Sequence, residues 1–253
     1  MSLRAVIFDL GGTLIDWPDY DQDIERRWKL SYDYFRVMLP QRELPECEVY
    51  VRAMREAEKS HWAMVQAVQG SSTPTAVVRD GFQRMGRQAS DEEVMTVLDG
   101  YGQALYGWAE AFPDSRSTLQ ALHERGYKIG LLSNTWWAAS WHNAEITAHN
   151  LAALLDTIVY TSDLPHSKPH SYVFYYVAER LGVRPEECVM VGDRMIDDVS
   201  GALSVGMRAV WRKSDYPWPK PEYIHPSAVI EHVSDVLPLL DQWKREDVQS
   251  IGQ

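Results

Sequence analysis

A chain of 253 residues, 45% of them hydrophobic, is long enough to bury a sizeable core as one large domain or two smaller ones. Its formal net charge of -11 argues against a nucleic-acid backbone or an anionic membrane surface as a partner, because both need clustered Lys and Arg. The sequence shows no membrane-spanning run and no secretion signal, and Cys47 and Cys188 match no metal spacing. We therefore expect a cytoplasmic protein with reduced thiols, as a monomer or a homodimer.

The first predicted element is a buried strand that begins at Val6 and delivers Asp9 to the edge of a sheet. The apolar run ends on this carboxylate and is followed by Gly11 and Gly12, a pair typical of a sharp turn. Ligands of open α/β sheets bind at the carboxyl ends of the strands. Asp9 is therefore a candidate for the chemistry.

Residues 15–111 then predict a helical insertion. Apolar residues recur at helical spacing from Ile24 to Met38 and from Val51 to Val68. Helix-start signals open two further segments, at residues 72–85 and 90–111. Four helices with short polar connections predict a small bundle.

From residue 112 onward, helices and strands alternate, which predicts parallel strands joined by crossover helices. The predicted helices cover residues 119–125, 138–149, 171–181 and 233–243, with Ala202 in a further helix, and the predicted strands cover residues 127–133, 157–161, 188–193, 208–211 and 228–230. The expected fold class is therefore α/β.

Three predicted strands end in polar side chains, namely Asp9, Ser133 and Asp193, and Lys168 lies in a loop between the last two. Neighbouring parallel strands bring their carboxyl ends together, so these groups are expected to converge. A carboxylate nucleophile, a second carboxylate for a divalent cation, and hydroxyl and ammonium groups for phosphoryl oxygens suit phosphoryl transfer. Mg²⁺ fits because it binds few carboxylates together with other oxygens.

Four motifs then occur in order along the chain. They are Asp9-Leu10-Gly11-Gly12-Thr13, Leu132-Ser133-Asn134-Thr135, Lys168-Pro169 and Gly192-Asp193-Arg194-Met195-Ile196-Asp197-Asp198. On these motifs the sequence resembles the haloacid dehalogenase-like hydrolase superfamily, apart from the insertion, where only position and helicity match. The resemblance implies a Rossmann-like parallel sheet core, with helices on both faces, over residues 1–14 and 112–253, and an all-helical cap over residues 15–111.

The resemblance also implies roles for the motif residues. The ligands for Mg²⁺ would be Asp9, which is also the nucleophile, the backbone carbonyl of Gly11, and Asp193, while Asp197 or Asp198, of which we select Asp198, would hold metal-bound water. The phosphoryl group would be bound by Gly12, Thr13, Ser133, Asn134 and Lys168, and Lys168 would also orient Asp9. The implied function is a Mg²⁺-dependent phosphatase-type hydrolase that acts on a small phosphorylated metabolite through a phospho-aspartate intermediate.

Gly11 departs from the family pattern, because phosphatases of this family usually carry a second aspartate at this position. That aspartate protonates the leaving oxygen and then activates water, and such help is typically worth about a hundredfold to ten-thousandfold in rate. Three interpretations stay open. In the first, another group replaces the aspartate, such as Asp16, His61 or water. In the second, the enzyme handles only activated or unusual substrates. In the third, the protein binds a phosphorylated ligand or a protein partner with little or no turnover.

Unusual substrates include carbon–phosphorus and carbon–halogen bonds. Carbon–phosphorus cleavage in this family needs a cap lysine, for which Lys29 and Lys59 are available. Dehalogenation is disfavoured, because those family members lack a metal and this chain keeps Gly192-Asp193 and a second acidic pair.

The remaining conspicuous residues have simpler interpretations. His166 and His170 flank Lys168, but Pro169 prevents a helix there, so we interpret them as loop residues near the site. We interpret His142 and His149 as surface or packing residues. For Trp136 and Trp137 we favour packing against the cap over stacking on a substrate.

Overall fold

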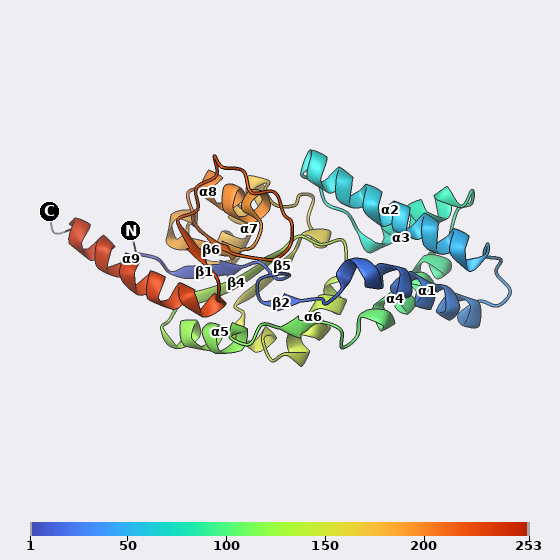
Figure 1. Ribbon diagram of the computed structural model, residues 1–253, viewed down its shortest axis with the longest axis horizontal. Coiled ribbons are helices and arrows are strands. Elements are labelled where there is room, and N and C mark those ends of the chain that lie inside the picture. Colours follow the sequence, from blue (N-terminus) through green and yellow to red (C-terminus); the bar gives the residue numbers. More distant parts are fainter. Residues whose placement is uncertain (1, 252–253) are drawn as a thin grey trace.

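The computed structural model describes residues 2–251 and contains a six-stranded parallel sheet in the order β5-β4-β1-β6-β7-β8 (Figure 1). The strands are β1 (Ala5–Phe8), β4 (Lys128–Ser133), β5 (Thr157–Tyr160), β6 (Cys188–Gly192), β7 (Arg208–Arg212) and β8 (Ala228–Ile230). β1 lies between β4 and β6, which puts the chain segment after Phe8 beside the ends of both neighbours. The expected α/β fold class is confirmed.

Helices cover both faces of this sheet, because the strands are apolar on both sides. Val6 and Phe8 of β1 pack into one hydrophobic cluster and Ala5 and Ile7 into the other, as the two-residue period of a strand requires. The helices are α5 (Ser115–Glu124), α6 (Ala139–Ala148), α7 (Ser171–Leu181), α8 (Gly201–Ser204) and α9 (Val236–Ile251), with a π-helical segment η4 (Met195–Ser200) before α8. Figure 1 shows α7 and α8 on one face of the sheet and α5, α6 and α9 on the other.

Four further helices gather at the end of the molecule toward which the residues after β1 run (Figure 1). They are α1 (Tyr20–Met38), α2 (Cys47–Val68), α3 (Pro74–Arg84) and α4 (Asp91–Leu105). They enclose a third hydrophobic cluster with Trp28 and Tyr101 among its buried residues. Trp136 and Trp137, from the loop after β4, are buried in the same cluster, so this loop joins the sheet to the helical bundle.

The helix-start signals predicted for the third and fourth helices are N-terminal caps in the structure. Thr73 caps α3, and Ser90 and Glu93 form a reciprocal capping box at the start of α4. However, α4 ends at Leu105, earlier than the predicted residue 111. The chain beyond it forms β3 (Glu110–Ala111), which pairs antiparallel with β2 (Ile15–Asp16). Two-residue strands carry too little alternation to be recognised in a sequence.

The bundle also contacts the loop that carries Lys168. The segment after α2 pairs with this loop through Gly70 and His166. Ser167 donates from its backbone N–H to Gln69 O (3.1 Å) and from its hydroxyl to Gly70 O (2.8 Å). The bundle is therefore tied to the core at a point next to Lys168. The division at residues 14/15 and 111/112 stays a prediction.

None of the helices within residues 2–251 is long and apolar enough to span a lipid bilayer.

Candidate active site

The turn after β1 is the first part of the site. Asp9 N–H bonds to Val191 O of β6 (2.9 Å), and Leu10 O accepts bonds from the N–H groups of Leu14 (2.9 Å) and Ile15 (3.1 Å). Gly12 has φ +71, and a Cβ there would lie 2.5 Å from Asp193 Oδ2. Only glycine fits this combination of positive φ and close approach. The turn thereby brings Asp193 against the backbone that follows Asp9.

Lys168 is the buried cation at the centre of the site. Its Nζ donates to Asp9 Oδ1 (2.7 Å), Asp198 Oδ1 (2.6 Å) and Leu132 O (2.8 Å), which uses all three ammonium hydrogens. Burial lowers the pKa of Lys168, but the charges of Asp198 and Asp9 outweigh it and the pKa is raised. Lys168 therefore stays protonated and fixes one oxygen of each carboxylate.

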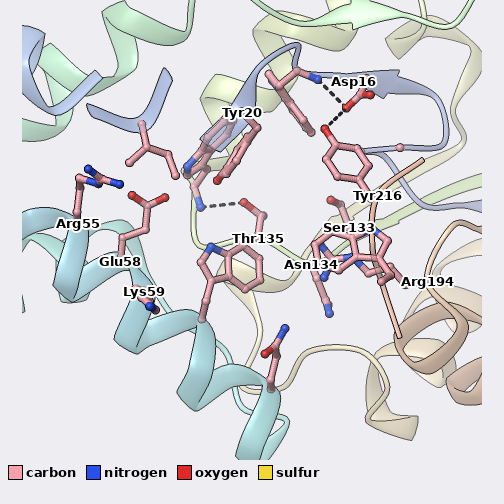
Figure 2. A pocket seen from close by; sticks show the side chains of 18 of the residues that line it. Asp16, Tyr20, Arg55, Glu58, Lys59, Ser133, Asn134, Thr135, Arg194 and Tyr216 are labelled. Carbon is pink, nitrogen blue, oxygen red and sulfur yellow. Dashed lines mark hydrogen bonds between the residues drawn. The ribbon is translucent and has the colours of Figure 1, made fainter. Parts of the chain in front are cut away.

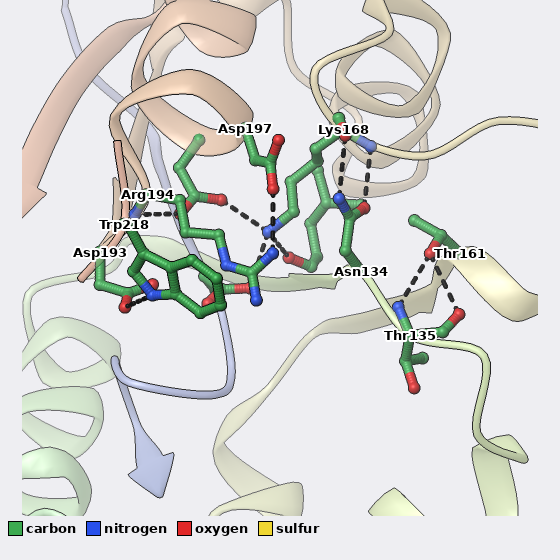
Figure 3. Close-up of polar contacts among 11 residues, drawn as sticks. Asn134, Thr135, Thr161, Lys168, Asp193, Arg194, Asp197 and Trp218 are labelled. Atoms are coloured by element: carbon green, nitrogen blue, oxygen red, sulfur yellow. Dashed lines mark hydrogen bonds and ion pairs between the residues drawn. The ribbon is translucent and has the colours of Figure 1, made fainter. Parts of the chain in front are cut away.

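Asn134 positions the backbone of Lys168, as Figure 3 shows. Its side-chain amide donates to Lys168 O (2.9 Å), and its carbonyl oxygen accepts from Lys168 N–H (2.8 Å). The side chain that we expected to bind phosphate is thus engaged in holding the lysine loop. The Asn134 side chain also lines the cavity, and its second amide N–H is not used by this pair of bonds.

Asp9, Asp193 and Asp198 form the cluster that could hold a metal. One oxygen from each lies within 4.8 Å of the others, all three side chains are buried, and Asp193 Oδ1 has no hydrogen-bond partner. A buried carboxylate oxygen without a partner is costly, and a hard cation would satisfy it. The residues present therefore fit Mg²⁺, and Gly11, which lines the same cavity, could add its carbonyl oxygen.

Burial disfavours the ionised forms of the carboxyl groups in this cluster. Burial chiefly, together with the charge of Asp198, raises the pKa of Asp9 to about 6, although Lys168 counteracts it. Burial and then the charges of Asp9 and Asp198 raise the pKa of Asp193 to about 7. Like charges at this range disfavour one another's ionisation, so the cluster favours either protons or a divalent cation.

The second acidic residue of the fourth motif is separate from this cluster. Asp197 pairs with Arg194 Nη1 (3.1 Å), whereas Asp198 accepts from the Arg194 backbone N–H (2.9 Å) and from Lys168. The geometry therefore favours Asp198 over Asp197 as the residue near a metal. Gly192 permits this arrangement, because a Cβ there would lie 2.3 Å from the Asp198 carboxyl.

A cavity of about 960 Å³ runs from these groups to helix α2 (Figure 2). Asp9, Ser133 and Lys168 line one part of it. Thr13, which we expected to bind phosphate, is fully buried and its hydroxyl has no hydrogen-bond partner, but it is not among the residues that line the cavity. Figure 2 shows Ser133, Asn134 and Arg194 on one side of the cavity and Arg55, Glu58 and Lys59 on the other.

The indole of Trp17 fills the space beside Gly11. A Cβ at position 11 would lie 2.6 Å from Trp17 Cζ3, so this space is closed to an aspartate side chain. Trp17 is held in turn by a bond from its Nε1 to Glu145 Oε1 (2.7 Å). Next to it, the half-buried Asp16 lines the cavity and accepts bonds at Oδ1 from Trp17 N–H (2.8 Å) and Tyr216 O–H (2.9 Å).

The structure separates the other candidates. Lys29 and Lys59 line the cavity, whereas His61 bonds to Ser72 Oγ (2.6 Å) and lines a separate small pocket. The rings of His166 and His170 stack on each other at 3.8 Å and do not line the main cavity.

Trp136 and Trp137 pack in the third hydrophobic cluster, that of the helical bundle, as we favoured, although Trp137 also lines the cavity. His142 is buried, bonds to Thr135 Oγ1 (2.9 Å) and stacks on Trp137 and Tyr160. His149 bonds to Ala109 O (2.8 Å). All four side chains therefore take part in packing or structural hydrogen bonds, and His142, like Trp137, also lines the cavity.

Sequence reasoning missed the contribution of the proline-rich loop after β7. Trp218 Nε1 donates to Asp193 Oδ2 (3.0 Å), and the guanidinium of Arg194 lies 3.9 Å from the Trp218 ring centre (Figure 3). Tyr216, from the same loop, bonds to Asp16. The available signal was the placement of aromatic residues in a loop that follows a strand of the sheet.

Comparisons with known proteins agree with this architecture. Residues 3–206 match the family model described as haloacid dehalogenase-like hydrolase. The chain is 27% identical to a glyceraldehyde 3-phosphate phosphatase of Methanopyrus kandleri, over 82% of this chain and 83% of the relative. It is 25% identical to (S)-2-haloacid dehalogenase 4A of Burkholderia cepacia, over 94% of this chain and 95% of the relative. A HAD phosphatase from Thermococcus onnurineus superposes with a TM-score of 0.60 at 25% identity, over 94% of this chain and 98% of that chain.

The three carboxylates predict a pH-dependent response to Mg²⁺. Without metal, folding favours the protonated forms of Asp9 and Asp193, so their contribution to stability is lost as pH rises from about 4 to about 7. Bound Mg²⁺ replaces those protons, so we expect Mg²⁺ to raise the melting temperature by several degrees at pH 8 and by much less at pH 5.

Thermal melts with Mg²⁺ or EDTA at both pH values measure this response. Asp193→Asn should abolish the Mg²⁺ shift, whereas Asp197→Asn should retain it. A wild-type melt that Mg²⁺ does not move at pH 8 would contradict the metal site.

Proposed function

The chain belongs to the haloacid dehalogenase-like hydrolase family, and on that premise we propose that it is a Mg²⁺-dependent phosphatase acting on a small phosphorylated metabolite through a phospho-Asp9 intermediate. The observation that carries this proposal is the buried arrangement of Asp9, Lys168 and Asp198, with Asp193 within 4.8 Å. The relative named glyceraldehyde 3-phosphate phosphatase supports the substrate class.

The reaction has two displacement steps at phosphorus. In the first, an Asp9 carboxylate oxygen forms a bond to phosphorus while the ester P–O bond breaks and the leaving oxygen takes a proton. In the second, water attacks phosphorus, gives up a proton and breaks the bond to Asp9, which releases phosphate. Splitting one difficult hydrolysis into two displacements is the general benefit of a covalent intermediate.

The surrounding residues hold the reacting groups in place. Lys168 fixes Asp9 and adds positive charge beside the transferred group. The Thr13 and Ser133 hydroxyls are proposed to donate to phosphoryl oxygens. Mg²⁺, held by Asp9, Asp193 and Asp198, would supply charge neutralisation of the phosphoryl oxygens.

Asp16 is the group that we propose transfers the proton in place of an aspartate at position 11. It lines the same cavity as Asp9, and its Oδ1 is held by Tyr216 and Trp17. This arrangement orients its carboxyl group, while the Trp17 ring closes the position that the family usually uses. His61, the cap alternative, lies outside the main cavity.

Two competing functions remain to be distinguished. The first is dehalogenation, which the dehalogenase relative suggests, but the three buried carboxylates favour a site that needs a cation. A member with weak or no turnover that binds a phosphorylated ligand or a protein partner is the other candidate, and the glycine at position 11 favours it. Turnover with an activated ester separates it from the phosphatase.

Asp9→Asn tests the nucleophile. We expect the wild-type protein with Mg²⁺ to hydrolyse para-nitrophenyl phosphate, because nitrophenolate leaves without a proton. We expect Asp9→Asn to lower kcat by about a thousandfold or more, because its amide cannot form the intermediate. Release of nitrophenol is measured, with added chelator as a further control.

Acetyl phosphate provides a second activated substrate for the same comparison. If wild type and Asp9→Asn are equally inactive on both compounds, the phosphatase proposal is wrong and the binding function replaces it.

Asp16→Asn tests the proton transfer. We expect kcat/KM on a primary alkyl phosphate to fall by about a hundredfold or more, since an alkoxide leaves poorly without a proton. On para-nitrophenyl phosphate the first step needs no acid but the second still needs a base. Rapid mixing should therefore show a burst of about one nitrophenol per enzyme followed by slow turnover.

Tyr216→Phe is the matched control, because it removes the bond to Asp16 but keeps the carboxyl group. We expect a smaller loss on the alkyl phosphate and no burst. An Asp16→Asn enzyme with the wild-type rate on alkyl phosphates would assign the proton transfer to another group or to water.

A further inference from the structure

The cavity continues beyond the catalytic residues to a region lined by charged side chains of the helical bundle, such as Lys29, Arg55 and Glu56, and by a set of aromatic and apolar side chains. Tyr20, Ile24, Val51, Trp62 and Trp137 line it. A ligand with its phosphoryl group at Asp9 would extend its organic part into this region, since both belong to one cavity. Apolar walls of this kind bind an organic body and leave orientation to a few polar groups.

Glu58 is the buried carboxylate of this region. It comes from α2, is 3% exposed, and lines the same cavity (Figure 2). Its Oε2 accepts a bond from Trp28 Nε1 (3.0 Å), whereas Oε1 is buried and has no hydrogen-bond partner. Burial chiefly raises the pKa of Glu58, although the bond from Trp28, the charge of Arg27, and the nearby Trp136 and Tyr20 side chains each lower it.

Arg27, the cation that acts on Glu58, does not donate a hydrogen bond to Glu58 Oε1. The guanidinium of Arg27 lies between the rings of Tyr20 and Trp108, 4.6 and 4.5 Å from their centres. Its Nη2 donates to Tyr20 O, and its Nε lies 3.8 Å from Asp23 Oδ2. Arg27 is paired with Asp23 and its charge also lowers the pKa of Glu58, but it donates no hydrogen bond to Glu58 Oε1, which keeps an unused acceptor position.

We propose that Glu58 Oε1 accepts a hydrogen bond from a protonated amine on the substrate, so that the enzyme prefers phosphate esters whose organic part carries an amino group. An ammonium group supplies the missing hydrogen bond and adds positive charge beside a buried carboxylate, and such charge-assisted bonds are the strong ones. The aromatic ring of Trp62, which lines the same cavity, also attracts a cation. This inference rests on the proposed phosphatase function for its substrate class.

The experiment compares esters of matched shape. Para-(aminomethyl)-, para-(aminoethyl)- and para-(aminopropyl)phenyl phosphate are each paired with the para-alkylphenyl phosphate of equal length, and a hydroxyl series provides a neutral donor. Aryl esters reduce the dependence on leaving-group protonation. For at least one length, we expect kcat/KM to favour the amine over its alkyl partner by about tenfold or more.

Glu58→Gln keeps the volume of the side chain but removes its charge, and we expect it to reduce this preference to about one. Glu92→Gln, which removes an exposed carboxylate from helix α4, should keep the wild-type preference. Circular dichroism and melting temperature report whether each variant folds. If Glu58→Gln does not fold, Trp62→Leu, which removes an aromatic wall, should reduce the preference severalfold.

Binding to Asp9→Asn, measured by calorimetry, separates this inference from the phosphatase proposal because it needs no turnover. Tighter binding of the amine than of its alkyl partner, lost in Glu58→Gln, would support the amine site even in a protein without activity. Equal binding or rates across all three lengths, or a hydroxyl series as good as the amine series, would overturn it. A preference unchanged by Glu58→Gln would also overturn it and leave water as the partner of Oε1.

Discussion

The ammonium group of Lys168 is the interaction on which the rest of the site depends. It joins Asp9 to Asp198 and to the backbone carbonyl of Leu132 near the end of β4, so the lysine of the third motif contacts the other three motifs. Three carboxylates cannot share so small a buried volume without compensating charge. Lys168 supplies one positive charge, and the remaining deficit explains why a divalent cation suits the space beside Asp193.

Several parts of the fold hold the residues of this site in place. Parallel pairing of β1 with β4 and β6 brings the polar residues together, and glycines at positions 12 and 192 allow the carboxylates to approach the backbone. Asn134 fixes the lysine loop, and the segment after α2 fixes the same loop from the cap. A displacement of the helical bundle would therefore move the loop that carries Lys168.

The core of the site was accessible from the sequence because each residue stands at the end of a strand. Asp9, Ser133 and Asp193 needed only the order of the strands to be brought together, and Lys168 needed only its motif. The sequence could not show that Trp17 fills the space beside Gly11, or that Trp218 reaches Asp193, because these contacts come from loops without a period. It also gave no reason to separate Glu58 from the other acidic residues of α2, since burial of a helical side chain depends on the partners that cover it.

The packing of Trp17 against Gly11 makes the residue choice at each of these positions depend on the other. An aspartate introduced at position 11 would meet the indole, and a smaller residue introduced at position 17 would leave a void and release Glu145 from its bond. Either change alone is unfavourable, so the effects on stability of substitutions at the two positions are expected not to add.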